Sequence, residues 1–389
     1  MSDIVKPHGG KLINRLVLEK NREKLTKHAQ ELFKIELVEE LVMDVDKIAI
    51  GAYSPIEGFF TQKDFQGVVE NMRLADGVPW TLPIILDVSE EIADKIKIGQ
   101  DVALLESQKD VPFAILHVED KYEFDKQNTI KKIFGTDNIE HPGVQKMLKL
   151  KPVLLGGKID VIERPKFEFS NLEMTPQETR DFFIKQGCKT VVGFHTRNVI
   201  HRAHEYLQRC ALEITDGLLI HPVVGKKKSG DFTAGAIVAS YQAMEKYYYP
   251  KNRVLFSVVS TYSRYAGPRE AVFTALLRKN YGCSHFIVGR DHTGVGNYYD
   301  IYASHKIFDE FGDDLGLTIF RFHEPLWCKK CGHITTEKTC IHSDQYEKIS
   351  GTLIRNLLSR GEKIPIKMMR PEVVKALLDF AKNNRLFVE

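Results

Sequence analysis

Residues 189–214 read KTVVGFHTRNVIHRAHEYLQRCALEI and pass from a short apolar run, through a polar turn, into a helical pattern. The apolar run predicts a buried strand at 189–194, and the remainder predicts a helix at 199–214. The alternation continues along the chain, with strands expected at 217–224, 253–260, 284–290 and 315–322 and helices at 232–249 and 268–282. Strands that alternate with helices of this length predict an α/β domain with a doubly wound parallel sheet.

The chain before this region has a different pattern. Residues 103–125 contain two β-rich segments around a polar turn, and residues 80–88 are a further strand candidate. These segments predict a mostly β domain. Within 164–187 a linker is followed by a helix, for which Thr175 is the expected N-cap. Pro176 at the first helical position and Glu178 three residues after the cap support that helix start.

Length and composition limit the class of protein. A chain of 389 residues is too long for one core, and we expect three domains, at 1–165, 166–325 and 326–389. The hydrophobic fraction is 43% and the net charge is +3, which fits a globular protein and does not favour nucleic acid as a partner. No apolar run is long enough to span a bilayer, and the N-terminus lacks a signal-peptide pattern, so the cytoplasm is the expected location.

The first polar motif, HTRNVIHRAH, lies where a strand is expected to pass into a helix. A helix N-terminus offers backbone N–H groups and partial positive charge to an anion, and Arg197 adds a bidentate donor. His201 and His204 are three residues apart and share one face of the predicted helix, where they can donate hydrogen bonds to a polyphosphate. A metal site and structurally buried histidines are the alternatives, but the metal interpretation lacks an obvious third ligand.

The second motif, GRDHTG at 289–294, follows another predicted strand. Gly289 permits close backbone approach, Arg290 supplies fixed charge, and His292 is a donor that pH can switch. Because ligands of such sheets bind at the carboxyl ends of the strands, the two motifs together predict a two-sided anion site. For two further basic segments the sequence does not decide between a structural role and a contact with the ligand. They are SRYAGPREA, with Arg264 and Arg269, and the loop with Lys226, Lys227 and Lys228.

The last part of the chain contains the pattern C-x2-C-x8-C-x-H, formed by Cys328, Cys331, Cys340 and His342. Three thiolates and an imidazole suit a structural zinc ion with four ligands, and cobalt is the alternative metal. His333 is an alternative fourth ligand. Such a site leaves no position for water, so we expect this metal to be structural. The other cysteines are expected to be small buried thiols.

These motifs resemble those of the ATP sulfurylase (sulfate adenylyltransferase) family, which carries Q-T-R-N-P-x-H-R-A-H and G-R-D-H-A-G. The resemblance covers essentially the whole chain, and further segments share it: PHGGKLINR, SPIEGFF, MRLADG, HPGV, RYAGPREA and SGTLIR. It implies a PUA-like N-terminal domain, a nucleotidyltransferase α/β domain and a small C-terminal domain. The cysteine cluster resembles the zinc-bearing prokaryotic branch. The chain ends at Glu389, so the kinase-type domain of some relatives is expected to be absent.

The resemblance also implies an activity and site residues. The family makes adenosine 5′-phosphosulfate and pyrophosphate from ATP and sulfate, with Mg²⁺ accompanying ATP, and its members are commonly homodimers or larger. The implied catalytic residues are Thr196, Arg197, Asn198, His201, His204 and Arg290. The implied ATP-binding residues are Arg197, Asn198, His201, His204, Gly289, Arg290, Asp291 and His292. The implied sulfate contacts are His195, Arg197 and Thr293.

The chain departs from the family pattern at three positions of the two motifs and at a fourth position before RYAGPREA. His195 replaces a glutamine, Val199 a proline, and Thr293 an alanine, and in RYAGPREA the preceding methionine is Ser263. We hypothesise that a charged His195 strengthens sulfate binding as the pH falls through about 6–7. The competing interpretations are a nucleotidyltransferase with another acceptor and an RNA-binding protein with a PUA-like domain and a zinc loop.

Overall fold

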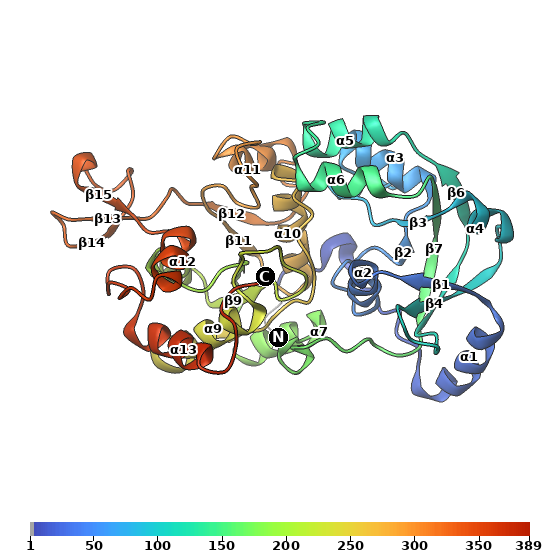
Figure 1. The fold of residues 1–389 in the computed structure, drawn as a ribbon, viewed down its shortest axis with the longest axis horizontal. Coiled ribbons are helices and arrows are strands. Elements are labelled where there is room, and N and C mark those ends of the chain that lie inside the picture. Colours follow the sequence, from blue (N-terminus) through green and yellow to red (C-terminus); the bar gives the residue numbers. More distant parts are fainter. Residues whose placement is uncertain (1–3) are drawn as a thin grey trace.

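The computed structural model describes residues 4–389 (Figure 1). Three sheets follow one another along the chain, with seven, five and three strands. Residues 1–3, which the sequence analysis includes in the N-terminal domain, lie outside the described residues.

The seven-stranded sheet belongs to the N-terminal part. Its strands are β1 (Phe33–Leu37), β2 (Gly58–Phe59), β3 (Leu86–Val88), β4 (Asp101–Glu106), β5 (Ala114–His117), β6 (Asp120–Glu123) and β7 (Val153–Val161). The main path is β1-β4-β5-β7-β2, and β3 and β6 also pair with β7. The segment 103–125 therefore contributes to three strands. The predicted strand at 80–88 forms a ladder only at 86–88, since Pro83, which lacks an N–H donor, falls within the earlier part.

Six helices also lie in this part, although the sequence analysis expected it to be mostly β. They are α1 (Glu19–Glu31), α2 (Glu39–Ala49), α3 (Gln62–Asn71), α4 (Glu90–Lys95), α5 (Lys126–Phe134) and α6 (Pro142–Lys149), and a short 3₁₀ turn precedes them at His8–Gly10. Short helices such as α4 and α6 are begun by side chains that cap them, Ser89 and His141, rather than by a long apolar periodicity.

The five-stranded sheet is wholly parallel and confirms the doubly wound fold. Its strands are β8 (Val191–Thr196), β9 (Gly217–Pro222), β10 (Val254–Phe256), β11 (His285–Val288) and β12 (Thr318–Arg321), in the order β10-β9-β8-β11-β12. The chain starts at the central strand β8, moves outward to β10, and then crosses back to β11. The order therefore reverses between β8 and β11, which is where an open α/β sheet forms its ligand crevice.

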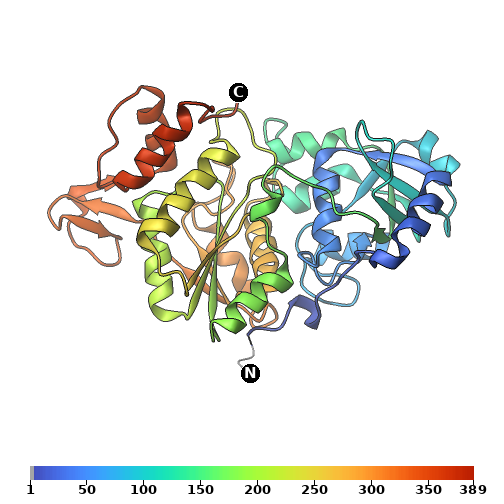
Figure 2. The same ribbon diagram turned by 90° about the horizontal axis from the view of Figure 1, so that it is seen from below.

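Helices cover both faces of this sheet (Figure 2). Four of them have more than one turn: α7 (Pro176–Lys185), α8 (Arg202–Ile214), α9 (Ala234–Tyr248) and α10 (Pro268–Asn280). A shorter α11 (Ala303–Lys306) precedes β12, and a 3₁₀ turn lies at Ser170–Leu172. The helix α7 begins with the predicted capping box, in which Thr175 and Glu178 exchange hydrogen bonds.

The N-terminal part and the parallel-sheet part share one core. The rings of Tyr53 and Trp80 pack against Phe273 of α10, with centroids 5.4 Å and 5.6 Å from it. Two arginines of the SRYAGPREA segment strengthen this junction: Arg264 binds Asp44 of α2 at 2.6 Å, and Arg269 donates to the carbonyls at the end of α3. The structure thus places both arginines in structural contacts between domains.

The C-terminal part contains a small antiparallel sheet and two helices. The sheet comprises β13 (Leu326–Cys328), β14 (His333–Thr335) and β15 (Tyr346–Lys348), and it projects at one end of the molecule (Figure 1). The helix α13 (Pro371–Ala381) packs along α9 and shares its core. The helix α12 (Gly351–Ser359) lies between the small sheet and α13 in the chain.

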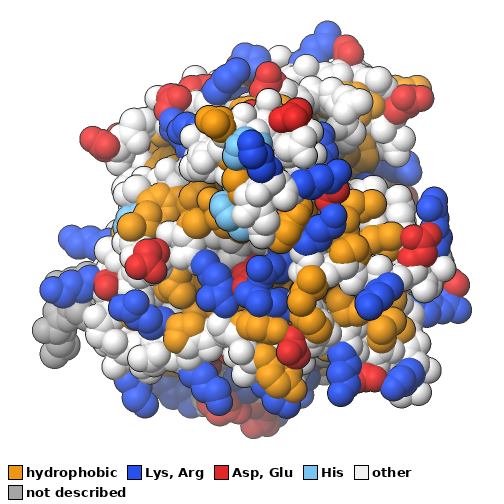
Figure 3. Space-filling model, turned by 90° about the vertical axis from the view of Figure 1, so that its left-hand side faces the viewer, with side chains coloured by type: hydrophobic (Ala, Val, Ile, Leu, Met, Phe, Trp, Pro, Cys, Tyr) orange, Lys and Arg blue, Asp and Glu red, His pale blue; other side chains and the backbone are white. Residues whose placement is uncertain are grey.

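The surface at the end that carries β13–β15 is mixed in character. Lys and Arg side chains form a small group near its centre and are otherwise dispersed among hydrophobic and acidic ones (Figure 3). Within residues 4–389, none of the helices is both long enough and apolar enough to cross a membrane.

Candidate active site at the β8–β11 switch point

The two polar motifs meet at one edge of the parallel sheet. β8 and β11 are hydrogen-bonded neighbours, and both point their carboxyl ends the same way. Thr196 is the last residue of β8, which extends two residues further than predicted because His195 and Thr196 pair with His221 and Pro222 of β9. Gly289 follows the last residue of β11. The predicted two-sided arrangement is therefore present in the fold.

Arg197 is half-buried at the end of β8. Its guanidinium receives no carboxylate from residues 4–389; it donates to Ser263 Oγ at 2.8 Å and lies over the ring of Tyr265. The adjacent N–H of Asn198 donates to Thr196 Oγ1 at 3.2 Å, which forms the turn that directs these side chains away from the strand. A half-buried, unpaired guanidinium is a binding group for an anion.

The helix α8 begins later than the sequence predicts, at Arg202 instead of Val199. His201 is its N-cap, and Nδ1 of this imidazole accepts the N–H of His204 at 3.3 Å. The N–H of Arg202 donates to the carbonyl of Met368. These partners already satisfy part of the helix N-terminus, so the expectation of a largely free set of backbone N–H donors is wrong, and the donors toward a ligand are side chains.

His201 and His204 stack with their ring centroids 3.8 Å apart. Burial lowers the pKa of His201 well below its ordinary value and that of His204 to about 4, so both rings are neutral near pH 7. Because Nδ1 of His201 accepts a hydrogen bond, its proton lies on Nε2. His201 therefore presents one fixed N–H donor without adding charge.

The GRDHTG loop leaves β11 in a constrained conformation. Asp291 and Thr293 both have positive φ angles, 52° and 58°, which are uncommon for residues with a side chain. Arg290 is exposed and lies 3.5 Å from Glu324, and burial raises the pKa of the Asp291 carboxyl against the opposing effect of Arg290. Constrained backbone of this kind is typical of ligand-binding loops.

One side chain of this loop differs from its predicted role, and the hydroxyl of Thr293, whose backbone is the predicted sulfate contact, is engaged within the protein. Burial and the nearby charges of Arg278 and Arg197 lower the pKa of His292 to about 3, so it is no donor that pH switches near neutrality. The Thr293 hydroxyl donates to the carbonyl of Gly267 at 2.7 Å, so its proton is used within the protein. Only the backbone N–H of Thr293 stays a candidate contact for an oxyanion.

His195 faces the same region from β8. Its ring lies 5.5 Å from that of His292, and its buried Nδ1 has no hydrogen-bond partner within residues 4–389. Burial first, and then the positive charge of Arg278, lowers the pKa of His195 well below its ordinary value. The hypothesis of a charged His195 near pH 6–7 is therefore wrong for the free protein, and a neutral imidazole faces the site.

Lys227 joins the site, which the sequence did not establish. Its ammonium donates to Val223 O at 2.9 Å, and the N–H of Val223 donates to the carbonyl of Thr196 at 2.9 Å, so the lysine lies next to the end of β8. Burial, followed by the charge of Arg197, lowers the pKa of Lys227 to about 8. Its neighbour Lys226 instead pairs with Glu40. Alternation of solvent-facing and inward-facing lysines within one loop was not visible in the run KKK.

The C-terminal part also reaches this site. The helix α12 starts at Gly351 after the N-cap Ser350, and a Cβ at position 351 would lie 3.3 Å from the amide carbon of Asn198. A side chain at position 351 would press on Asn198 and shift it by a few tenths of an ångström, so the glycine lets the helix start lie this close to it. The SGTLIR segment thus contributes to the position of Asn198, a role that its sequence alone did not indicate.

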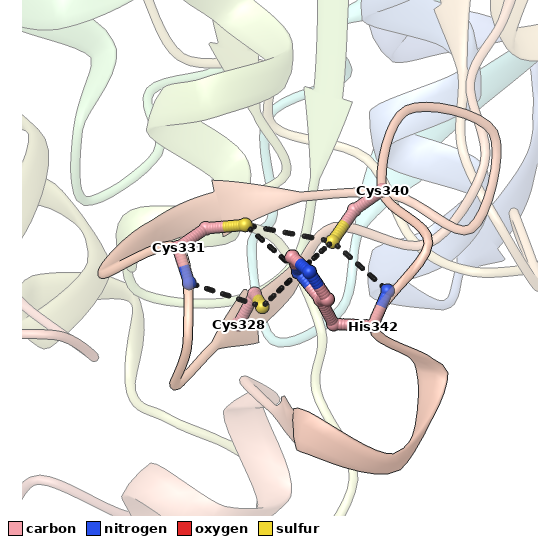
Figure 4. A group of neighbouring side chains, drawn as sticks. All are labelled: Cys328, Cys331, Cys340 and His342. Atoms are coloured by element: carbon pink, nitrogen blue, oxygen red, sulfur yellow. Dashed lines mark hydrogen bonds between the residues drawn. The ribbon is translucent and has the colours of Figure 1, made fainter.

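The four predicted metal ligands come together at the end of β13 (Figure 4). The Sγ atoms of Cys331 and Cys340 are 3.6 Å apart, and Nδ1 of His342 lies 3.3 Å to 3.8 Å from the sulfurs of Cys328, Cys331 and Cys340. A tetrahedron with metal–ligand bonds of about 2.0 to 2.3 Å has edges of about 3.4 to 3.8 Å, so these side chains can hold a metal ion. The alternative ligand His333 is exposed and outside the group.

The parallel sheet, its switch point and the cationic residues around it define a nucleotidyltransferase-type α/β enzyme with an anion site. The ATP-sulfurylase family model matches residues 170–380, and a PUA-like domain model matches residues 5–164. The chain belongs to the ATP sulfurylase family.

Named relatives agree with this assignment. A sulfate adenylyltransferase of Halothermothrix orenii is 50% identical, over 96% of this chain and 99% of its own. A sulfate adenylyltransferase of Hyperthermus butylicus is 46% identical, over 99% of this chain and 98% of its own. Among solved structures, a hexameric APS kinase from Thiobacillus denitrificans has a TM-score of 0.77 over 97% of this chain and 69% of its own; at 23% identity, this likeness concerns the fold.

Proposed function

We propose that this enzyme transfers AMP from ATP to sulfate, which gives adenosine 5′-phosphosulfate and pyrophosphate. A sulfate oxygen attacks the α-phosphorus in line and forms the new P–O bond. The bond from that phosphorus to the oxygen bridging to the β-phosphate breaks, and pyrophosphate leaves with the electron pair. No proton is exchanged in either direction, so the reaction is reversible without a general base.

The observation that carries this proposal is the set of donors at the β8–β11 edge, in which the arginines are positive and the imidazoles neutral. Asp291 is the one carboxylate among the predicted residues, and burial raises its pKa. The obstacle to the reaction is repulsion between a dianion and a polyanion, so positive charge and oriented donors provide the catalysis. Arg197 is placed to contact both sulfate and the α-phosphate. Asn198, held against Gly351, and Thr196 steady the reacting phosphorus and the departing pyrophosphate.

The remaining residues divide between the two anions. His201 and His204 donate to the β- and γ-phosphates, and Gly289, Arg290, Asp291 and His292 form the loop on the other side of the nucleotide. His195 and the backbone of Thr293 contact sulfate. Mg²⁺ bound to ATP neutralises phosphate charge, and the donors of this site suit phosphates rather than a protein cage for Mg²⁺, so phosphates and waters hold the ion.

Further properties follow from the same proposal. Zinc is the metal we assign to the Cys₃His group, since three thiolates and one imidazole suit it, with cobalt as the alternative. The chain forms a homodimer or a larger homo-oligomer in the cytoplasm, without nucleic acid or membrane as partners. Light scattering of the purified protein tests the assembly, and metal analysis distinguishes the two metals.

A coupled assay for pyrophosphate tests the activity. Pyrophosphate release from ATP and Mg²⁺ is expected only when sulfate is present, and ATP is expected to form when adenosine 5′-phosphosulfate and pyrophosphate are supplied. Phosphate, molybdate and selenate serve as alternative acceptors. Equal turnover without sulfate, or preference for phosphate, would assign the site to another acceptor.

A further inference from the structure

Arg278 is a buried arginine beneath the centre of the parallel sheet. It belongs to α10 and is 1% exposed. A Cβ on Gly193 of β8 would lie 3.0 Å from the Cβ and Cγ atoms of Arg278, so the side chain passes directly under that strand. The absence of a side chain at Gly193 makes this passage possible.

The guanidinium has few partners for a group so deeply buried. Its two terminal nitrogens donate to the carbonyls of His221 at 2.9 Å and Thr274 at 3.4 Å, while its Nε has no acceptor within residues 4–389. The groups whose ionised forms would favour its charge are Tyr281, Cys283 and Tyr53, with no carboxylate among them. Burial raises the pKa of all three, so they are neutral near pH 7 and offer no counter-charge. A buried charge without a counter-charge is unfavourable, so its presence calls for a compensating anion.

The position of the guanidinium connects it to the predicted sulfate contacts. His221, which accepts its hydrogen bond, pairs in register with His195. Thr274 Oγ1, one helical turn before Arg278, lies 3.4 Å from Nε2 of His292. The charge therefore lies beneath the part of the sheet that carries both imidazole rings, whose centroids are 5.5 Å apart and whose planes are tilted by 48°.

We infer that Arg278 supplies a second fixed positive charge to the sulfate subsite, from beneath and in addition to that of Arg197, acting through the neutral rings of His195 and His292. The inference rests on the proposed function and deepens it. Burial first, and then this charge, lowers the pKa of each imidazole, so both stay neutral. Neutral rings can still donate N–H bonds, so the two imidazoles act as donors and Arg278 adds charge beneath them.

Arg180 offers a matched control. It is 7% exposed and also lacks a carboxylate partner among the residues that favour its ionised form. Its three nitrogens donate to the carbonyls of Asn280, Val5 and Lys279, at 2.7 to 2.8 Å, so every nitrogen of this guanidinium has an acceptor. Arg180 therefore has a structural role at the start of the chain.

The test compares a dianion with a monoanion, because a charge interacts twice as strongly with the former. In Arg278→Met, the KM for sulfate is expected to rise roughly tenfold, whereas the Ki of perchlorate, as competitor of sulfate, rises about threefold, the square root of that factor. The KM for ATP is expected to stay within about twofold. Arg180→Met is expected to lower the Tm and leave both anion affinities unchanged.

Equal losses for sulfate and perchlorate, or a sulfate KM that Arg278→Met does not change, would overturn the inference. If Arg278→Met does not fold, Arg278→Gln is expected to show the same unequal loss of affinity for the two anions. Arg278→Lys, which keeps the charge, is expected to retain the wild-type ratio of the sulfate KM to the perchlorate Ki. A glutamine variant that retains this ratio would equally overturn the inference. The rise of Tm on addition of sulfate measures the affinity for the dianion without turnover. A wild-type protein that shows this rise but has no activity would refute the proposed reaction and leave the sulfate subsite standing.

Discussion

Nδ1 of His201 accepts the backbone N–H of His204 at 3.3 Å, and the two rings stack. One imidazole thus closes the helix N-terminus and, through the same bond, keeps its own proton on Nε2. Both rings are neutral because burial lowers their pKa values. We therefore expect the pair to act as a preset donor for phosphate oxygens and not as a source of charge.

Replacing His201 separates its two roles. His201→Ala is expected to lower the free energy of unfolding by about 1 kcal/mol through loss of the cap. It is also expected to reduce kcat by roughly 100-fold through loss of an oriented donor. His201→Asn keeps a capping side chain, so its Tm should approach that of the wild type while kcat stays low. Denaturant unfolding and steady-state kinetics measure both. An alanine variant with wild-type kcat would exclude the donor role.

Replacing Arg197 distinguishes a role in the active site from a role in the stability of the fold. Since its guanidinium donates to Ser263 and has no carboxylate partner among residues 4–389, Arg197→Ala should leave the Tm within a few degrees. Its turnover is expected to fall by roughly 100- to 1000-fold or more. Ser263→Ala removes only the hydrogen bond that orients the guanidinium, so its turnover should fall by less than about tenfold. Wild-type turnover in Arg197→Ala would refute the assignment of the site.

Lys227 predicts an alkaline limit to activity. Its pKa of about 8 in the free protein means that it is charged below that pH and loses its charge above it. Since the charge attracts anionic substrates, kcat/KM should be level below about pH 8 and fall by up to tenfold per unit above it. Lys227→Met should have a lower and level profile over pH 7–9. Lys228→Met, an exposed neighbour in the same loop, should keep the wild-type profile; an alkaline fall that persists in Lys227→Met would assign it to another group.

The metal group predicts a link between a distant loop and the active site. The cluster ends at His342, β15 ends at Lys348, and Gly351 contacts Asn198 shortly afterwards. Cys331→Ser is therefore expected to lose the bound metal, lower the Tm and reduce kcat by roughly tenfold, because small displacements at a reacting centre are costly. Cys210→Ser, outside the group, should keep its metal. Full kcat in a metal-free Cys331→Ser protein would show that the loop does not support Asn198.

The doubly wound parallel sheet could be predicted because each strand–turn–helix unit carries its own signal in sequence. The predicted capping box at Thr175 and Glu178 shows how local chemistry specifies a helix start. The helices of the N-terminal part were missed, since several are short and rest on tertiary packing. The start of α8 was misplaced because Val199 and Ile200 are apolar and fit a helix, although they are core residues before its cap.

The sequence could predict that the two motifs meet at the ends of β8 and β11, but not the protonation of their side chains or the residues that other segments contribute. The motifs identified which side chains gather at β8 and β11, because strand ends meet at a known edge. The pKa of a histidine depends on what surrounds it in three dimensions, and Arg278, Lys227 and Gly351 come from segments distant in sequence. These contributions appear only when the chain is folded.

His195 tests whether the fold sets the protonation of a histidine in this site. Its ordinary pKa of 6.5 is lowered well below that value by burial and by Arg278, so the ring gains no proton between pH 8 and pH 6. The KM for sulfate is therefore expected to stay constant over this range, whereas a ring with an ordinary pKa would bind the dianion more tightly as the pH fell. His195→Gln, which retains an N–H donor, should keep kcat within about threefold and the same level profile, since a neutral donor replaces a neutral donor. Steady-state measurements at saturating ATP decide the matter: a KM that falls with pH in the wild type and stays level in His195→Gln would show that substrate binding protonates the imidazole.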